Sequence, residues 1–135
     1  MKLYGIGTDI VKTKRINKFI NKKLHISRIF NEREIFKCKK IKNLTNCFAK
    51  RFAAKEAFSK ALGTGISQGI NFNEIIILNE KNGKPYIKLL NKTKKIVEKK
   101  LKTKKYKISL SLTDEDQYAV AFVTISRWDL NRLKI

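Results

Sequence analysis

Residues 51–66 read RFAAKEAFSKALGTGI, and this stretch decides the fold. Together with Phe48, its apolar residues recur at the three- and four-residue spacing of one helix face. The run Gly63-Thr64-Gly65 is typical of a helix that ends at a glycine cap and continues into a loop. Thr45 is the expected N-cap. The stretch therefore predicts a long central helix that ends at Leu62.

The sequence before this helix predicts one strand followed by shorter helices. Residues 3–11 mix aromatic and β-branched residues and contain two glycines, which indicate a close approach of another backbone or of a ligand. Thr13 is the expected N-cap of a helix through about residue 24. Asn31 and Glu34 have the spacing of a capping box and open another short helix.

The sequence after the long helix changes to strand patterns. The dipeptide Asn82-Gly83 is a hairpin signal between two short apolar runs. Strands are expected over residues 74–78, 86–90, 106–112 and 118–125, with a lysine-rich helix over residues 92–101. This order predicts an α+β fold in which a mostly antiparallel sheet packs against the long helix and the shorter helices.

Length and composition limit the class of protein. The chain has 135 residues, 42% of them hydrophobic, and no Pro/Gly/Ser-rich linker, so we expect a single domain over residues 1–135, with residues 126–135 as a surface tail. No apolar run approaches the roughly 20 residues of a membrane span, and the start lacks a signal peptide. We expect a cytoplasmic protein, with Cys38 and Cys47 as two reduced thiols that form neither a disulfide framework nor a zinc site.

The charge is strongly positive. Lysine and arginine number 32 against 11 acidic residues, a formal net charge of +21. Such a field attracts polyanions, including nucleic acids, acidic membrane surfaces and acidic proteins or nucleotides. A composition biased toward lysine, isoleucine and asparagine would also give much of this charge. The charge alone therefore identifies no partner.

Two carboxylates lie within apolar elements, where burial is costly unless the charge is paired or binds a metal. Asp9 lies in the first strand and Glu56 in the long helix. An ion pair of Glu56 with Lys55 or Lys60 is an ordinary explanation, and Asp9 could cap the next helix. Together, on neighbouring elements, the two carboxylates could instead hold Mg²⁺, which binds one or two carboxylates plus phosphate oxygens and waters.

A candidate phosphate site follows on the same helix. Arg51, Lys55, Ser59 and Lys60 offer cations and a hydroxyl, and they lead into the glycine-rich residues 63–69. This is not a P-loop, because the glycines follow the helix instead of opening it. By itself the pattern favours Mg²⁺-dependent chemistry on a phosphoanhydride only weakly.

The motifs resemble those of the holo-acyl-carrier-protein synthases, a group of 4′-phosphopantetheinyl transferases. The resemblance is carried by residues 5–11 with Arg15-Ile16 and by residues 51–66. It continues in the same order through residues 28–30 with Glu34, 82–86, 109–113 and 118–121. It thus covers the chain from Gly5 to about Ile125, at the length of the small, single-domain members.

The resemblance implies transfer of the 4′-phosphopantetheine arm of coenzyme A to a serine of apo-acyl carrier protein, with release of adenosine 3′,5′-bisphosphate, in support of fatty acid biosynthesis. Asp9 and Glu56 match the metal ligands of the family, for Mg²⁺ or Mn²⁺, and with Lys60 they form the implied catalytic set. The resemblance further implies that Asp9, or a water held by the metal or by a nearby carboxylate, takes the serine proton. The implied coenzyme A contacts are Arg51, Lys55, Ser59, Lys60, Gly63, Thr64, Gly65, Asn82, Gly83, Lys84 and Pro85.

The resemblance also implies two kinds of protein contact. The family is generally a homotrimer with each active site between two subunits. Acyl carrier protein is acidic, and the implied docking residues on this chain are Arg15, Lys18, Lys22 and Arg28. The chain departs from the sequence pattern of the family at Asp114, where many relatives have histidine. A carboxylate at this position would repel a nucleotide phosphate.

Two other classes of function fit less well. A basic nucleic-acid-binding protein would explain charge and size, but the chain shows no RNP-like aromatic platform, helix-turn-helix or zinc finger. A carrier-binding module without catalysis would not need Asp9, Glu56 and Lys60 together. We therefore expect no specific nucleic-acid partner and no membrane partner.

Overall fold

The computed structural model describes residues 1–65 and 68–128. Its elements, in chain order, are β1 (Lys2–Lys12), α1 (Thr13–Ile20), α2 (Lys23–Ile29), α3 (Glu32–Lys39), α4 (Leu44–Leu62), the 3₁₀ turn η1 (Phe72–Glu74), β2 (Ile75–Asn79), β3 (Pro85–Leu89), α5 (Asn91–Leu101), β4 (Tyr106–Glu115) and β5 (Tyr118–Arg127). Within the described residues, no helix is both long enough and apolar enough to cross a membrane.

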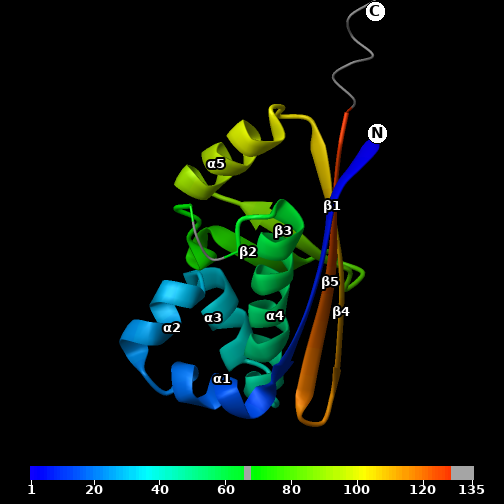
Figure 1. Cartoon of the computed structure of the whole chain (residues 1–135). Helices are drawn as coiled ribbons and strands as arrows, with labels where there is room; N and C mark the ends of the chain where they lie inside the picture. Colours follow the sequence, from blue (N-terminus) through cyan, green and yellow to red (C-terminus); the bar gives the residue numbers. More distant parts are fainter. Residues whose placement is uncertain (66–67, 129–135) are drawn as a thin grey trace, which may run out of the picture.

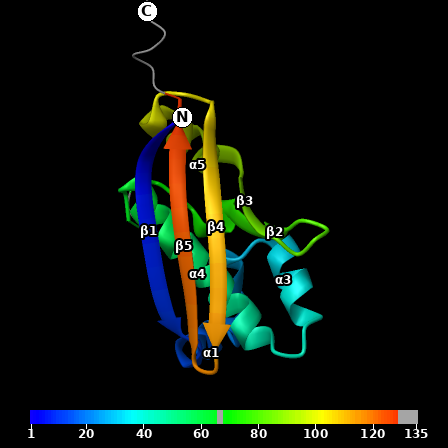
Figure 2. The ribbon, with the colours of Figure 1, turned by 90° about the vertical axis from the view of Figure 1, so that its right-hand side faces the viewer.

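The strands form two antiparallel sheets. One has the order β1-β5-β4, and the other is the hairpin of β2 and β3. Figure 1 shows α4 running between the larger sheet and the shorter helices, and Figure 2 shows the three strands of that sheet side by side from their outer face. The predicted α+β fold, with an antiparallel sheet against a long central helix, is confirmed.

Helix α4 is the centre of the hydrophobic core. Most of its residues are buried, Phe48, Phe58 and Leu62 among the largest. Its predicted end is confirmed, because Gly63 adopts the left-handed conformation (φ 87°) of a glycine C-cap. Its predicted start is wrong: the cap is Asn43, whose side chain accepts a hydrogen bond from the Asn46 N–H, and not Thr45.

Two glycines allow β1 to lie directly on α4. A Cβ atom at Gly7 would lie 2.7 Å from the backbone nitrogen of Ala61 and would overlap the carbonyl oxygen of Ala57. A Cβ atom at Gly5 would overlap the carbonyl oxygen of Ala61 in the same way. The predicted close approach of another backbone is confirmed, and that backbone belongs to α4.

Replacing Gly7 by alanine is therefore expected to destabilise the protein by about 2 kcal/mol or more, because either the strand or the helix must move. The matched control is Gly65→Ala, where a Cβ atom would meet no described atom within 4 Å and the positive φ of 58° costs about 1 kcal/mol. Thermal unfolding of both variants measures the difference. A Gly7→Ala variant as stable as Gly65→Ala would contradict the tight contact.

The helices that follow β1 differ from the predicted single helix. Helix α1 ends at Ile20, Lys22 leaves the helical region (φ −113°, ψ 111°), and α2 begins at Lys23. Thr13 is not an N-cap but the first residue of α1, and its N–H donates to Gln117 O. The capping box of Asn31 and Glu34 is confirmed at the start of α3.

The C-terminal half follows the predicted order with small shifts. The hairpin turn lies between β2 and β3, which pair from Ile75↔Leu89 to Asn79↔Pro85. Strands β4 and β5 are longer than predicted, so the first two residues of the expected tail belong to β5. Residues 129–135 of that tail lie outside the described residues.

Candidate active site

Asp9 lies on the inner face of the larger sheet, opposite α4. Side chains alternate along β1, and the inward residues Gly7 and Val11 on either side of Asp9 are buried. Lys60 of α4 reaches across, and its Nζ lies 3.1 Å from Asp9 Oδ1 and 3.0 Å from Thr8 O. The strand and the helix are thus neighbours, as the predicted site requires.

Glu56 lies one helical turn before Lys60, and the charge of Asp9 affects the pKa of its carboxyl. Burial and, after it, the negative charge of Asp9 raise the pKa of the Glu56 carboxyl above its usual range, while Lys60 and Arg15 act in the opposite direction. The two carboxylates therefore interact across the contact between β1 and α4. Two neighbouring carboxylates, with Lys60 beside them and the charge of Arg15 within reach, form a site that a further cation could join.

Two ordinary explanations, an ion pair of Glu56 with a lysine and a cap from Asp9, are not seen in the described residues. Lys60 pairs with Asp9, and Lys55 pairs with Glu34, so neither lysine makes an ion pair with Glu56. Asp9 does not cap α1, whose N-cap position is Lys12. The described residues contain no cluster of three or more histidine, cysteine or acidic residues that could hold a metal alone. A metal here would need further oxygen ligands from a substrate or from water.

The position of Lys55 differs from the one expected for a coenzyme A contact. Its side chain is fully buried, and its Nζ donates to Glu34 Oε1 at 2.7 Å, to Phe72 O at 2.7 Å and to Ile75 O at 2.5 Å. Burial lowers the pKa of Lys55 to about 8, against the opposing effect of Glu34. The prediction that Lys55 contacts coenzyme A is therefore wrong: it faces the interior and joins α4 to α3 and to the start of β2.

The residues after Lys55 on α4 point in different directions. Ser59 is buried, and its hydroxyl donates to Glu56 O at 2.8 Å, so in this structure it bonds its own helix. The backbone N–H groups of Gly63, Thr64 and Gly65 all donate to Ser59 O, at 3.1 to 3.3 Å. The glycine turn is thus a closed cap at the end of α4. Ile66, which completes the motif, lies outside the described residues.

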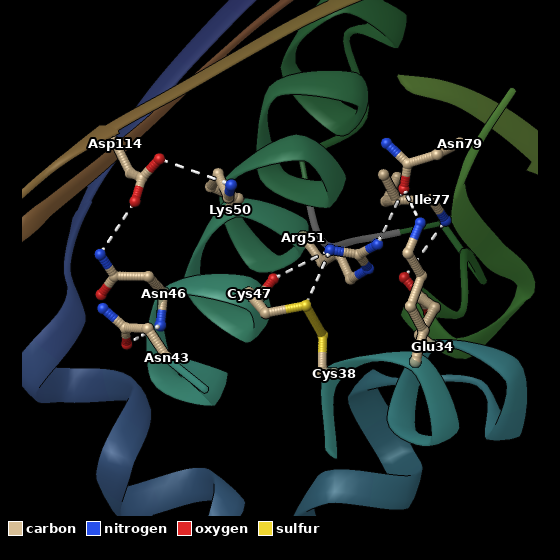
Figure 3. Close-up of a disulfide and its surroundings, with 11 residues drawn as sticks. Glu34, Cys38, Asn43, Asn46, Cys47, Lys50, Arg51, Ile77, Asn79 and Asp114 are labelled. Carbon is tan, nitrogen blue, oxygen red and sulfur yellow. Dashed lines mark hydrogen bonds and ion pairs between the residues drawn. A yellow bond between two sulfur atoms is a disulfide. The ribbon is translucent and has the colours of Figure 1, made fainter. Parts of the chain in front are cut away.

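Arg51 belongs to a separate cavity of about 320 Å³. Its Nη2 donates to Asn79 Oδ1 at 3.2 Å (Figure 3). Asn79 Nδ2 in turn donates to Gly83 O at 2.9 Å. The structure thereby links Arg51 to the turn at residues 82–85, as a shared nucleotide site requires. Lys37 Nζ also donates to Asn79 Oδ1, and burial followed by Arg51 and Lys50 lowers the pKa of Lys37.

Asp114 lines the same cavity, and its charge is compensated. Its carboxylate accepts a hydrogen bond from Asn46 Nδ2 at 2.9 Å and lies 3.4 Å from Lys50 Nζ (Figure 3). Three cationic side chains, Lys37, Lys50 and Arg51, line the cavity with this one carboxylate. The sequence motifs did not include Lys37, Lys50, Asn46 or Asn79, because these residues come from three elements and meet only in the folded chain.

Cys38 and Cys47 are joined by a disulfide, so the expectation of two reduced thiols is wrong (Figure 3). The cysteines lie at the end of α3 and in the first turn of α4, and the short connection folds back so that their Cα atoms are 5.5 Å apart. That separation is within the range of disulfides, whereas a spacing of nine residues in sequence gives no such information.

The predicted docking residues are all exposed, but they do not share one helix. Arg15 and Lys18 belong to α1, Lys22 lies in the break after it, and Arg28 belongs to α2. Arg15 is close enough to the carboxylate pair for its charge to lower the pKa of Glu56. The basic surface therefore begins beside the Asp9–Glu56 site and extends over α2.

Comparisons with known proteins show the family to which the chain belongs. A family model described as the 4′-phosphopantetheinyl transferase superfamily matches residues 5–123. The holo-[acyl-carrier-protein] synthase of Pelagibacter ubique is 46% identical over 127 residues, which are 94% of this chain and 99% of that protein. That of Orientia tsutsugamushi (strain Boryong) is 44% identical over 92% of this chain and 97% of that protein.

Solved structures show the same fold. The holo-(acyl-carrier-protein) synthase of Bacillus anthracis, in complex with CoA (3′,5′-ADP), has a TM-score of 0.77 at 33% identity, covering 95% of this chain and 100% of that chain. The enzyme from Neisseria meningitidis has a TM-score of 0.81 at 35% identity, covering 93% and 99%.

Proposed function

Because the chain belongs to the 4′-phosphopantetheinyl transferase superfamily, and is an enzyme of that family, we propose that it is a holo-[acyl-carrier-protein] synthase. It transfers 4′-phosphopantetheine from coenzyme A to a serine of apo-acyl carrier protein and supports fatty acid biosynthesis. The observation that carries the proposal is the pair Asp9 and Glu56, held on β1 and α4 with Lys60 beside them.

The reaction breaks the anhydride bond of the coenzyme A pyrophosphate. The serine oxygen forms a bond to the phosphorus next to pantetheine, adenosine 3′,5′-bisphosphate leaves, and the serine proton passes to Asp9 or to a water beside the carboxylates. Lys60 donates to the phosphate oxygens as charge develops on the leaving group. Asp9 and Glu56 would hold Mg²⁺ or Mn²⁺. The bound metal would neutralise negative charge on the pyrophosphate.

The cavity at Arg51 is the proposed site of the coenzyme A nucleotide. Arg51 Nε is buried and has no hydrogen-bond partner among the described residues, so Arg51 keeps an unpaired donor, and two further cations, Lys37 and Lys50, line the cavity with it. An anionic group such as a phosphate would supply the missing acceptor. The turn Asn82-Gly83-Lys84-Pro85, which is linked to Arg51 through Asn79, closes the adenine side of this site.

Carrier-protein docking is proposed at Arg15, Lys18, Lys22 and Arg28. These exposed cations lie on α1, in the break after it and on α2, and the charge of Arg15 acts on Glu56 of the carboxylate pair. An acidic partner would be attracted to this surface and its serine brought near Asp9. Opposite charges of this kind raise the association rate more than the final affinity, so the attraction should weaken as salt is added.

We also propose a homotrimer built on the outer face of the larger sheet. Ile6 and Ile10 of β1 and Phe122 of β5 are all exposed in the single chain, on the side of the sheet away from α4. Several large apolar side chains exposed on one face of a sheet are typical of an association surface. The cavity of about 450 Å³ lined by Ile10 and the β4–β5 turn opens on this face, so a neighbouring subunit could complete a site there.

The substitution Phe122→Glu is expected to weaken self-association about 30-fold or more, because it buries a charge at a central aromatic contact. Sedimentation equilibrium measures the change in mass, and transfer activity should fall with it. The control is Phe36→Glu on α3, which is even more exposed in the single chain, at 65% against 42%. A trimer that persists in the Phe122 variant would place the interface elsewhere.

The activity itself is tested by incubating apo-acyl carrier protein with coenzyme A, Mg²⁺ and the protein, and measuring the intact mass of the carrier. A gain equal to one phosphopantetheine, abolished by EDTA and restored by added Mg²⁺ or Mn²⁺, is the expected result. No gain with several carrier proteins would reject the proposed function. The cytoplasmic location stays a prediction.

A further inference from the structure

The disulfide Cys38–Cys47 lies at the wall of the Arg51 cavity. Cys38 is fully buried, whereas Cys47 also lines the cavity. Arg51 Nη1 donates both to the Cys47 carbonyl oxygen at 3.2 Å and to Cys47 Sγ at 3.1 Å (Figure 3). One sulfur of the disulfide is therefore an acceptor that positions the guanidinium group.

The position of this sulfur depends on its covalent bond. While Cys47 is bonded to Cys38, its Sγ is held at one place between α3 and α4. A free Cys47 thiol can occupy other χ1 rotamers, and α3 is no longer tied to α4 at this point. Arg51 would then keep the Cys47 carbonyl and Asn79 as acceptors and lose the fixed sulfur.

We propose that Cys38 and Cys47 form a thiol–disulfide exchange site whose redox state sets the affinity of the Arg51 cavity for the nucleotide of coenzyme A. This inference rests on the proposed function, which places that nucleotide beside Arg51. The co-reactant is a dithiol reductant. The predicted cytoplasmic location would expose the pair to such dithiols, and disulfides in that compartment are usually transient or redox-sensing.

The exchange proceeds in two balanced steps. A thiolate of the reductant attacks Sγ of Cys47, the cysteine that lines the cavity, and the bond to Cys38 breaks with Cys38 leaving as a thiolate. The second thiol of the reductant, as its thiolate, then attacks the reductant sulfur that is bonded to Cys47, and Cys47 leaves as a thiolate. The reductant ends as a cyclic disulfide, and its two electrons and two protons end on the two cysteines.

Ligand and reductant compete for the same entrance. A nucleotide that occupies the cavity covers Cys47 and slows the attack, because Cys47 is reached from the cavity whereas Cys38 is fully enclosed. Coupling between the nucleotide and the redox state is reciprocal, so a disulfide that favours the nucleotide must also be stabilised by it. Two separate measurements test the proposal: the rate at which the disulfide is reduced with and without nucleotide, and the KM of the two redox forms for coenzyme A.

The first measurement follows reduction of the wild-type protein by dithiothreitol. Aliquots are alkylated with iodoacetamide, and intact mass counts the modified cysteines over time. Saturating adenosine 3′,5′-bisphosphate, which has no thiol, is expected to slow reduction about fivefold or more. Equal rates with and without this nucleotide overturn the proposal, as does a purified protein that forms no Cys38–Cys47 bond when treated with an oxidised dithiol.

The second measurement compares the oxidised and the reduced enzyme in initial-rate transfer assays. The KM for coenzyme A is expected to be about fivefold or more higher for the reduced form, with little change in the KM for the carrier. Equal KM values for coenzyme A overturn the inference while leaving the proposed function intact. Absence of transfer by both forms rejects the proposed function instead.

Cys38→Ser is the discriminating variant, because it removes the disulfide and keeps the sulfur of Cys47. It should show the KM of the reduced enzyme and no response to dithiothreitol. A Cys38→Ser variant with the KM of the oxidised enzyme overturns the proposal. Circular dichroism checks its fold, and the protection experiment on the wild-type protein stands whether or not this variant folds.

Discussion

Asp9→Asn and Glu56→Gln are each expected to lower the rate of phosphopantetheine transfer about a thousandfold, since a metal ion contributes several kcal/mol to stabilising phosphate charge. Both changes keep the size of the side chain and remove one negative charge. The loss should appear in kcat/KM for coenzyme A. Isothermal titration with Mn²⁺ and adenosine 3′,5′-bisphosphate should show that neither variant binds the metal like the wild type.

The matched control for this prediction is Glu32→Gln, which removes one charge from an exposed carboxylate in the first turn of α3. It should retain the activity and the metal binding of the wild-type protein. If Asp9→Asn and Glu56→Gln transferred phosphopantetheine at rates near that of the control, the carboxylate pair would not be the catalytic site.

Lys55→Met is expected to lower the free energy of unfolding by about 4 kcal/mol, because it leaves the carboxylate of Glu34 buried without its cation. Chemical denaturation measures this loss. The KM of the remaining folded enzyme for coenzyme A should not change, since Lys55 faces the interior. A stable Lys55→Met variant with a raised KM would restore the original prediction that Lys55 contacts the coenzyme.

Lys60→Met provides the reciprocal control on the same helix. Its side chain is 53% exposed, so its ion pair with Asp9 contributes less than about 1 kcal/mol to stability. Its removal should instead lower transfer about a hundredfold, by the loss of one donor to the reacting phosphates. The double variant Lys55→Met/Glu34→Gln should recover about 2 kcal/mol relative to Lys55→Met, since it removes the unpaired charge.

The sequence predicted the larger elements because their signals are local. Periodicity gave α4, the glycine cap gave its end, and the box at Asn31 and Glu34 gave the start of α3. The errors lie where a local signal competes with packing. The predicted helix after β1 is interrupted at Lys22, and α1 and α2 each bury one isoleucine. No proline or glycine marks this break in the sequence.

The candidate site was predictable only in part, for the same reason. Asp9 and Glu56 attract attention as carboxylates in apolar elements, and the fold does bring their strand and helix together. Lys55 and Lys60 are indistinguishable by composition, yet one is enclosed and the other reaches Asp9. Whether a lysine of α4 is buried or exposed depends on which elements pack against that side of the helix, and those elements are distant in sequence.

The contact of Gly5 and Gly7 with α4 has a consequence for how this enzyme tolerates change. The separation between β1 and α4 is set by main-chain atoms in contact, not by the volume of side chains between them. Substitutions elsewhere in the core can alter packing without moving the strand that carries Asp9 relative to the helix that carries Glu56. The amino-acid composition of such a chain can therefore become rich in lysine and isoleucine while the spacing of its two carboxylates stays the same.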